Sequence, residues 1–363
     1  MAKWEIMSRN RLQRTLCLLA IITGVFLSSA LDANAATLNV PHDYPTIQAG
    51  IDAAQDGDTV LVAPGTYVEC LSIQSKWTIT VASSAGPEAT IIDADGKGAA
   101  FIIRDCACTL QGFTMKNGLG PGADAIIISD SWPKIRGNIF AANMLAGGTR
   151  IAILVYGISE PWIERNIFLN PGSIWITSST SLTITNNLFL NNSGAAIEFI
   201  GGNCSYEVTN NTIVGNNVGI SVYYPFTGSS PICKNNIFVG NNTAFEVTTS
   251  PAGSVTGHIT SQNNLLYGNT VNYSGVSDQT GINGNISADP LFWAPAVNNF
   301  HLRSGSPAIG AADTSSIYLS ATDLGGYPRA VNGRLDIGAY EFNPKENYIL
   351  YTMTASAAAG GAI

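Results

Sequence analysis

Two glutamates occupy equivalent places in short segments of alternating apolar and polar residues. Each is flanked by large apolar residues, in the runs Ile197-Glu198-Phe199 and Phe245-Glu246-Val247. If the apolar neighbours face a core, both carboxylates face solvent, two repeats apart and about 9.6 Å from each other at ordinary strand spacing. Carboxyl groups about 6.5–9.5 Å apart can act as acid and base in inverting glycoside hydrolysis. The alternative is a pair of solvated glutamates on an exposed strand.

Four further side chains fall beside these glutamates when the repeats are aligned. Trp175 takes the equivalent place one repeat before Glu198, and Ser221 takes the place between the two glutamates. An indole can stack on a sugar ring, and two tyrosines follow close to Ser221. We therefore expect the two glutamates to be catalytic and four residues to bind the substrate: Trp175, Ser221, Tyr223 and Tyr224.

A repeated phrase of asparagine followed by apolar residues sets the positions of these segments. It begins as a degenerate copy at Gly112 and recurs at intervals of 26, 28, 21, 24, 25 and 28 residues. Each unit contains short alternating runs such as residues 182–185, and lacks the 3.6-residue period of a helix. Several short strands per unit, separated by asparagine and glycine turns, predict one coil of a β-solenoid.

The repeated asparagines are expected to be structural. Coils stack at about 4.8 Å, so equivalent residues lie directly above one another. An asparagine tolerates a tight turn and can hydrogen-bond to its copies above and below. The triplets at 191–193 and 241–243 are interpreted as turns as well. We expect a ladder at one turn, formed by Asn138, Asn166, Asn187, Asn211, Asn236 and Asn264.

Residues 46–54 predict a short helix that caps the start of the solenoid, because a solenoid must cover its core and protect its strand edges. Ile47, Ile51 and Ala54 share one face of this amphipathic segment. The helix can lie across the first coil, which begins at residues 58–62.

The two ends of this region resemble those of the pectate-lyase-like right-handed β-helix superfamily. At the start, the similar residues are Tyr44-Pro45-Thr46-Ile47-Gln48 and Gly57-Asp58-Thr59-Val60-Leu61-Val62-Ala63-Pro64-Gly65-Thr66-Tyr67. The end is similar to a closing segment of exported bacterial members, with the pieces Asp289-Pro290-Leu291-Phe292, Phe300-His301-Leu302, Ser306-Pro307-Ala308-Ile309-Gly310 and Asp336-Ile337-Gly338-Ala339-Tyr340-Glu341. The resemblance covers residues 37–342.

This resemblance implies an all-β, single-stranded right-handed parallel β-helix with a short N-terminal capping α-helix. It also implies a polysaccharide or surface glycan as the partner, since sugars in this superfamily lie along one parallel sheet. The superfamily contains lyases, hydrolases, esterases, epimerases and non-enzymes, so the activity does not follow from the fold. The hydrolase patterns of its pectin-degrading members are absent from the chain.

A lyase needs a lysine or arginine as its base, and the candidates considered in the coils are Arg150, Arg165 and Lys234. Arg165 and Lys234 fall beside the asparagine turn, away from the candidate face. Arg150 stays open as a base on the wall of a groove. The terminal residues Asp336 and Glu341, with Arg334, are expected to hold the final coil together rather than to catalyse.

Residues 1–35 have the features of a signal peptide. A basic start with Lys3, Arg9, Arg11 and Arg14 precedes an apolar run at 16–27, and Ala33-Asn34-Ala35 supplies the small residues of a cleavage site. The apolar run is shorter than the roughly 20 residues of a transmembrane helix. We therefore expect a secreted protein that is extracellular, periplasmic or on the cell surface, without membrane insertion after cleavage.

The charge of the chain excludes some partners. The full chain carries a net charge of −8, and removal of residues 1–35 takes four basic and two acidic residues and leaves −10. Such a surface repels nucleic acid and anionic membranes but tolerates neutral glycans. We expect no nucleic-acid partner and a monomer.

The cysteines that remain after cleavage are odd in number: Cys70, Cys106, Cys108, Cys204 and Cys233. Export permits disulfides, but an odd count leaves at least one free thiol. A bond from Cys70 to Cys106 or Cys108 and a bond between Cys204 and Cys233 are the alternatives.

No cofactor is expected, with calcium as the one alternative. Asp93 and Asp95 precede a turn glycine, but a calcium loop needs six or more oxygen ligands, so a plain turn is favoured. Asp124 and Asp130 flank an outward strand, and the same two interpretations, a calcium site or a plain turn, apply to them.

Together these observations divide the chain into four parts. They are a signal peptide at 1–35, the β-helix with its helical cap at 36–288, a closing segment at 289–342, and a tail at 343–363. The tail is either a linker with the truncated start of a further β-module or a frayed end. The predicted function is a secreted protein that binds polysaccharide or processes it as a hydrolase or lyase. The alternative is a non-catalytic cell-surface adhesin or structural spacer.

Overall fold

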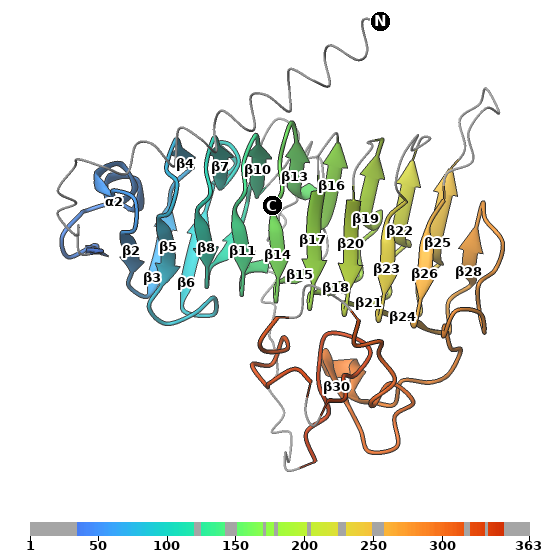
Figure 1. Ribbon diagram of the computed structural model, residues 1–363. Coiled ribbons are helices and arrows are strands. Elements are labelled where there is room, and N and C mark those ends of the chain that lie inside the picture. The colour runs from blue at the N-terminus through green and yellow to red at the C-terminus, as the bar shows by residue number, and fades with distance from the viewer. Residues whose placement is uncertain are drawn as a thin grey trace, which may run out of the picture. The chain divides into compact units, whose positions relative to one another are not determined.

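The chain is a right-handed parallel β-helix in which each coil gives one strand to each of three parallel sheets (Figure 1). This confirms the predicted fold class. The computed structural model describes residues 35–119, 125–141, 151–169, 172–177, 181–201, 205–223, 230–248, 258–315, 320–330 and 333–344. The predicted signal peptide up to residue 34 and the tail from residue 345 lie outside these residues.

The first sheet, called sheet A, has ten strands in chain order. They are β1 (Thr37–Val40), β2 (Thr59–Val62), β5 (Thr80–Ser83), β8 (Thr109–Gln111), β11 (Lys134–Arg136), β14 (Trp162–Glu164), β17 (Ser181–Thr185), β20 (Ser205–Thr209), β23 (Ile232–Lys234) and β26 (Thr260–Gln262).

Sheet B has nine strands, each following a strand of sheet A across a short connection. They are β3 (Gly65–Val68), β6 (Thr90–Asp93), β9 (Thr114–Lys116), β12 (Ile139–Phe140), β15 (Ile167–Leu169), β18 (Leu188–Leu190), β21 (Thr212–Val214), β24 (Ile237–Val239) and β27 (Leu265–Tyr267).

Sheet C also has nine strands and completes each coil. They are β4 (Leu71–Gln74), β7 (Phe101–Arg104), β10 (Ile126–Ser129), β13 (Ile151–Tyr156), β16 (Ser173–Thr177), β19 (Ala195–Ile200), β22 (Val218–Tyr223), β25 (Thr243–Thr248) and β28 (Val271–Ser274).

The predicted asparagine ladder forms at the turn between sheets A and B. In each step, the side-chain oxygen of one asparagine accepts hydrogen bonds from the backbone and side-chain nitrogens of the asparagine one coil earlier, as Asn211 does for Asn187 at 2.9 and 3.0 Å. The ladder runs one coil further than predicted, because Asn285 accepts the same pair from Asn264.

A second ladder, at the turn between sheets B and C, explains the asparagine triplets. Asn192, Asn216, Asn241 and Asn269 are joined by the same paired hydrogen bonds of 2.8–3.0 Å. Both ladders are largely buried, so their amide groups satisfy backbone groups that water cannot reach. The two ladders fix the corners of the coils and therefore the register of sheet C.

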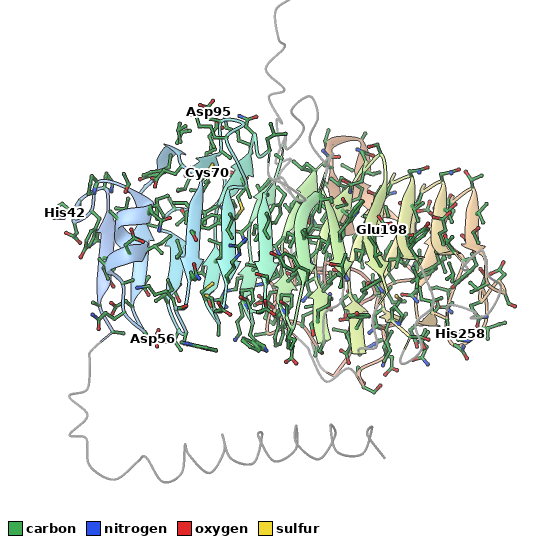
Figure 2. All side chains as sticks on the ribbon, turned by 90° about the horizontal axis from the view of Figure 1, so that it is seen from above. His42, Asp56, Cys70, Asp95, Glu198 and His258 are labelled. Atoms are coloured by element: carbon green, nitrogen blue, oxygen red, sulfur yellow. The ribbon has the colours of Figure 1, made fainter. Side chains whose placement is uncertain are left out.

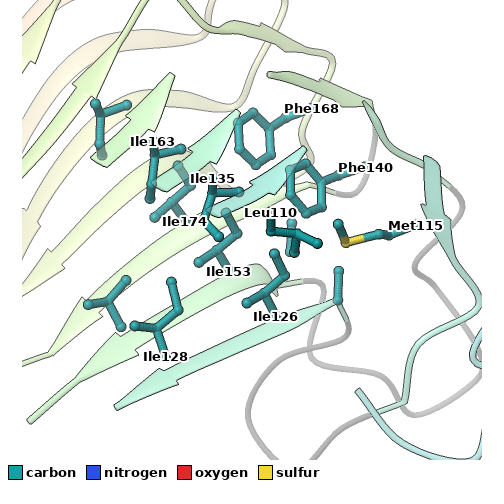
Figure 3. Close-up of a cluster of buried hydrophobic side chains, with 14 of the residues drawn as sticks. Leu110, Met115, Ile126, Ile128, Ile135, Phe140, Ile153, Ile163, Phe168 and Ile174 are labelled. Atoms are coloured by element: carbon teal, nitrogen blue, oxygen red, sulfur yellow. The ribbon is translucent and has the colours of Figure 1, made fainter. Parts of the chain in front are cut away.

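The core lies inside the three sheets and consists of stacked apolar side chains (Figure 3). Phe140, Phe168 and Phe189 occupy the same place in successive coils, with ring centroids 4.6 Å apart and planes within 4°. This offset stacking follows from the coil spacing and favours one register over its neighbours.

The helix α2 (Ile47–Ala53) covers the start of the core, as predicted. Thr46 caps it by accepting a hydrogen bond from the Ala49 nitrogen at 3.1 Å, and Glu69 accepts from the nitrogens of Ile47 and Gln48. Ile47 and Ile51 are fully buried. The segment after β28 covers the other end, where Ile286 bridges to Leu265.

The predicted closing segment lies against the flank of the solenoid, not across its last coil (Figure 1). It contains β29 (Phe292–Ala294), the 3-10 helix η1 (Pro295–Val297) and β30 (Asn299–Leu302). Its apolar residues pack on the outward side of sheet B, in a cluster that includes Leu188, Leu190, Ile237, Leu265, Phe292, Phe300, Ile337 and Tyr340. Sheet B is therefore covered on both faces where these residues lie.

Three asparagines that directly precede ladder asparagines make polar contacts with the closing segment. Asn186, Asn210 and Asn235 have positive φ angles of 56–57° and project outward. Asn186 accepts hydrogen bonds from Arg329, Asn210 donates to the Asp336 carbonyl at 3.2 Å, and Asn235 binds Asp313. In the doublets Asn186-Asn187, Asn210-Asn211 and Asn235-Asn236, the second residue thus builds the ladder and the first holds the closing segment.

The closing segment is also held together internally, by buried ionic groups. Arg329 pairs with Glu341, and the Asp336 carboxylate accepts from the nitrogens of Gly310 and Phe342 at 2.6 Å each. Asp336 and Glu341 thus have a structural role, as expected. They hold the closing segment together, however, rather than the last coil.

The disulfide predictions are wrong where the structure describes them. Cys70, Cys106, Cys108 and Cys233 are free thiols, and Cys204 lies outside the described residues. The thiols of Cys106 and Cys108 interact with each other inside the core. Among the described residues, no helix has the length and apolar character to cross a membrane.

Candidate functional site

Five of the six predicted site residues belong to strands of sheet C, and Tyr224 directly follows one of them in the sequence. In the structure, one short strand of sheet B lies between the main asparagine turn and each of these strands of sheet C. The sequence analysis did not predict this intervening strand. Trp175 pairs with Glu198, Glu198 with Ser221, and Ser221 with Glu246, on neighbouring strands β16, β19, β22 and β25. The four residues form one straight line, called here the column, as the alignment of the coils predicts.

The column points away from the core because its neighbours on each strand point into it. Ile174, Ile176, Ile197 and Phe199 are fully buried, and Glu198 and Trp175 between them are half-buried. Successive residues of a strand face opposite sides of a sheet, so burial of the flanking pairs forces the residues between them outward. Figure 2 shows Glu198 in the middle part of the solenoid.

Glu198 and Glu246 lie two strands apart, which corresponds to about 9.6 Å along the stack. Desolvation by burial raises the pKa of Glu198, and the negative charge of Glu246 raises it further. The two carboxylates therefore interact through space. Ser221 between them is small and almost fully buried, at 5% exposure, so neighbouring side chains cover most of it.

Toward the N-terminal coils, the line of outward residues becomes apolar. Ile102, Ile127 and Leu154 precede Trp175 on β7, β10 and β13. They form an outward apolar cluster that also includes Ala99, Ile151 and Tyr156. The sequence reasoning missed this cluster, although the runs Phe101–Arg104 and Ile126–Ser129 are apolar at outward as well as inward positions.

Of the two predicted substrate-binding tyrosines, the structure describes Tyr223. Tyr223 is two residues after Ser221 on β22, on the same face of sheet C and 38% exposed. It pairs in register with Ile200 and Thr248, in the line next to the column. Tyr224 lies outside the described residues, as does Arg150.

The basic residues of the central coils lie away from the column, as predicted. Lys234 is on β23 of sheet A, where its ammonium group is 2.7 Å from Asp313 and 2.8 Å from the Ser315 hydroxyl. Arg165 donates to the Thr322 hydroxyl at 2.9 Å. Both side chains are therefore held by the closing segment.

The acidic turn at Asp93 has its own protein partners. The Asp93 carboxylate accepts from Asn117 at 2.9 Å and from the Asp95 nitrogen at 3.0 Å, and Lys116 is 3.2 Å away. One Asp130 oxygen accepts from the Ile158 nitrogen at 3.0 Å, and Asp124 is not described. Within the described ranges, no three His, Cys, Asp or Glu side chains lie close enough to hold a metal ion.

The histidines lie away from the column. His42 and His258 lie toward opposite ends of the solenoid, with Glu198 between them (Figure 2). Burial lowers the pKa of His301 to about 4, and this ring packs on Tyr340 in the closing segment. Glu198 and Glu246 are thus the titratable groups that the column offers for proton transfer.

Comparison with known proteins agrees on the fold. The family model described as the right handed beta helix region matches residues 80–227. No curated protein matches the chain. Among solved structures, the chain is similar to the pectate lyase Pel9A, with 13% identity, a TM-score of 0.43, and coverage of 81% of this chain and 90% of that one.

Two alginate lyases of the PL6 family show similarities of the same order. A mutant of the alginate lyase AlyGC gives a TM-score of 0.42 at 14% identity, covering 70% of this chain and 40% of that one. A PL6 alginate lyase in complex with a trisaccharide gives a TM-score of 0.42 at 11% identity, covering 86% of this chain and 70% of that one. At these identities and TM-scores, the similarities say nothing of the reaction.

Proposed function

We propose that this protein is a secreted polysaccharide-binding β-helix protein that hydrolyses glycosidic bonds on the outward face of sheet C. The observation that supports this most is the register of the column, which holds Glu198 and Glu246 two strands apart with only the small Ser221 between them. That spacing is close to the separation of an acid and a base that work with a water molecule between them.

In the proposed reaction, Glu198 is the general acid. Its raised pKa keeps a fraction of the group protonated where an ordinary carboxyl group would be ionised. The proton passes to the glycosidic oxygen as the bond to the anomeric carbon breaks. Glu246 accepts a proton from a water molecule, and the remaining hydroxide forms the new bond to that carbon with inversion.

Trp175 and the tyrosines position the sugar. Trp175 is one strand, or about 4.8 Å, before Glu198, so a ring stacked on the indole places its linkage beside the acid. Tyr223 flanks the column, and Tyr224 is proposed to act with it. The hydroxyl group of a tyrosine can form hydrogen bonds with sugar hydroxyl groups, and its ring can pack on the carbon–hydrogen face of a sugar.

The proposal also covers export, oligomeric state, partners and cofactors. We propose that residues 1–35 direct export, that the mature chain is monomeric, and that neither nucleic acid nor membrane is a partner. The proposed reaction uses no cofactor. A calcium site needs six or more oxygen ligands, which is more than the described acidic turns supply.

A second candidate is a non-catalytic adhesin or spacer. The half-buried Ile102 and Leu154, which pack on the buried Ile127, favour this function, because they offer apolar contact area without any group that transfers protons. A lyase is less well supported, since Lys234 and Arg165 are engaged by the closing segment.

The test is a screen of the full chain for glycan binding and for release of reducing ends. Glu198→Gln and Glu246→Gln should each lower hydrolysis at least about 100-fold while the thermal unfolding midpoint stays within a few degrees. Glu88→Gln, an exposed glutamate in the turn between β5 and β6, is the matched control and should leave hydrolysis unchanged. Hydrolysis that survives both column variants would refute the carboxylate pair, and binding without hydrolysis would favour the adhesin.

A further inference from the structure

We infer that the column selects uncharged glycans and rejects chains of uronic acids. This inference rests on the proposed function, since it names the class of substrate for the same site. It concerns the charge that a ligand meets on sheet C and the apolar surface next to it.

The coils that carry the column are almost free of positive charge. Between residues 166 and 262, which include the four column strands and every loop between them, Lys234 is the only lysine or arginine. Its ammonium group pairs with Asp313 on sheet A. The same stretch contains three carboxylates, two of them in the column: Glu198, Glu207 and Glu246. A ligand on the column therefore meets negative charge without compensation from these coils.

The other strands of sheet C supply no positive charge close to the column, and Arg150, which precedes β13, lies outside the described residues. Arg104 is the only lysine or arginine among the nine strands of this sheet. It lies on β7, four strands before Glu198 on β19, which is about 19 Å along the stack. Screening reduces exposed interactions beyond about 8–10 Å at physiological ionic strength. Arg104 therefore cannot offset the charge of Glu198 and Glu246.

The two column carboxylates already repel each other across Ser221: burial is the main cause of the raised pKa of Glu198, and the negative charge of Glu246 adds to it. A uronate carboxylate bound beside them adds a third negative charge, and each further unit adds another. Hydroxyl groups of a neutral sugar have the opposite effect, because they donate hydrogen bonds to a carboxylate. The column is thus suited to ligands that donate hydrogen bonds and carry no charge.

The apolar neighbours of the column support the same class of ligand. Trp175 and Leu154 are both half-buried and adjacent in register, so together they offer an apolar platform two strands wide. The carbon–hydrogen face of a neutral hexose or pentose packs on such a surface. A bound chain is expected to extend from Glu246 past Trp175 toward β13.

The test measures binding of the full chain to two panels of oligosaccharides matched in length, in EDTA and at about 0.15 M salt. One panel contains neutral oligomers of glucose, xylose, mannose and galactose, and the other contains oligomers of galacturonate, mannuronate and guluronate. At least one neutral oligomer should bind about tenfold more tightly than every uronate of its length. The difference should shrink at about 1 M salt, because screening weakens the repulsion.

The double variant Glu198→Gln, Glu246→Gln separates charge from shape. It should raise the affinity for uronates several-fold, whereas the control Glu88→Gln should leave the ratio between the panels unchanged. A uronate bound as tightly as its neutral match, or bound only when calcium replaces EDTA, overturns the inference. Absence of binding by both panels overturns it as well.

The outcome is independent of the hydrolysis test. If neutral glycans bind but are not cleaved, the proposed reaction fails and the selectivity stands. If uronates bind and are cleaved by way of Glu198 and Glu246, the reaction stands and the selectivity fails.

Discussion

Asn235 and Asp313, 78 positions apart in the sequence, exchange two hydrogen bonds of 2.9 Å. The Asn235 side chain donates to the Asp313 carbonyl, and its oxygen accepts from the Asp313 nitrogen. The Asp313 carboxylate also pairs with Lys234 on the strand before this turn. One turn of the solenoid and one loop of the closing segment are thereby fixed to each other.

We predict that Asn235→Gly lowers the free energy of unfolding by about 1–3 kcal/mol, because two backbone groups lose their partners. Glycine accepts the positive φ of this position, so backbone strain does not contribute. Asn191→Gly is the control, because Asn191 has a similar φ but is exposed. Urea denaturation measures both variants, and equal losses would mean that the bonds to Asp313 add nothing to stability.

A second prediction concerns pH and Asp323, which is fully buried in the closing segment. Desolvation raises the pKa of Asp323 to about 6, from an ordinary value of 3.8. Between these values the folded state keeps a proton that the unfolded state has lost, so the contribution of Asp323 to stability falls as pH rises from about 4 to 6.

Asp323→Asn removes this titration. Relative to the variant, the wild type should lose about 1–3 kcal/mol of unfolding free energy between about pH 4 and pH 7. Urea denaturation at both values measures the difference, with exposed Asp105→Asn as the control. Parallel pH dependence of the wild type and Asp323→Asn would contradict the raised pKa.

A third prediction concerns the pH profile of hydrolysis. Activity should fall on the alkaline side as Glu198 loses its proton, because the acid must be protonated. Glu246→Gln removes the negative charge that helps to raise the pKa of Glu198. In the residual activity of this variant, the alkaline limb of kcat/KM should therefore move to lower pH. A limb that stays in place would assign the acid to another group.

Trp175→Ala should weaken glycan binding about 5- to 30-fold, since stacking on an indole contributes on the order of 1–2 kcal/mol. The unfolding midpoint should change little, because Trp175 faces outward. Trp77→Ala is the matched control, because Trp77 is exposed and stacks on Trp132 in the turns between sheets C and A. Isothermal titration measures both variants, and equal losses would argue against the column as the binding face.

The parts of the fold that the sequence predicted follow rules of short range. The ladder of Asn187 and Asn211 recurs at one coil length, and the column follows from alternation within a strand, so both can be found from spacing alone. The capping helix at Ile47–Ala53 carries its own cap residue. These features need no knowledge of distant contacts.

The parts that were missed depend on distant contacts. The closing segment was expected at the last coil, yet Arg329 reaches back 143 positions to Asn186. The position of the closing segment could not be predicted from its own residues. The asparagine doublets, however, mark the coils that it contacts. The apolar cluster around Ile127 was missed because an apolar residue in a strand was assumed to face the core.

The closing segment changes how the solenoid would come apart. In an array of coils that touch only their neighbours, a pulling force can peel one coil after another from an end. Here one segment holds residues of four successive coils, from Glu164 in β14 to Asn235 after β23. Those coils should therefore resist peeling together and yield in a single large step.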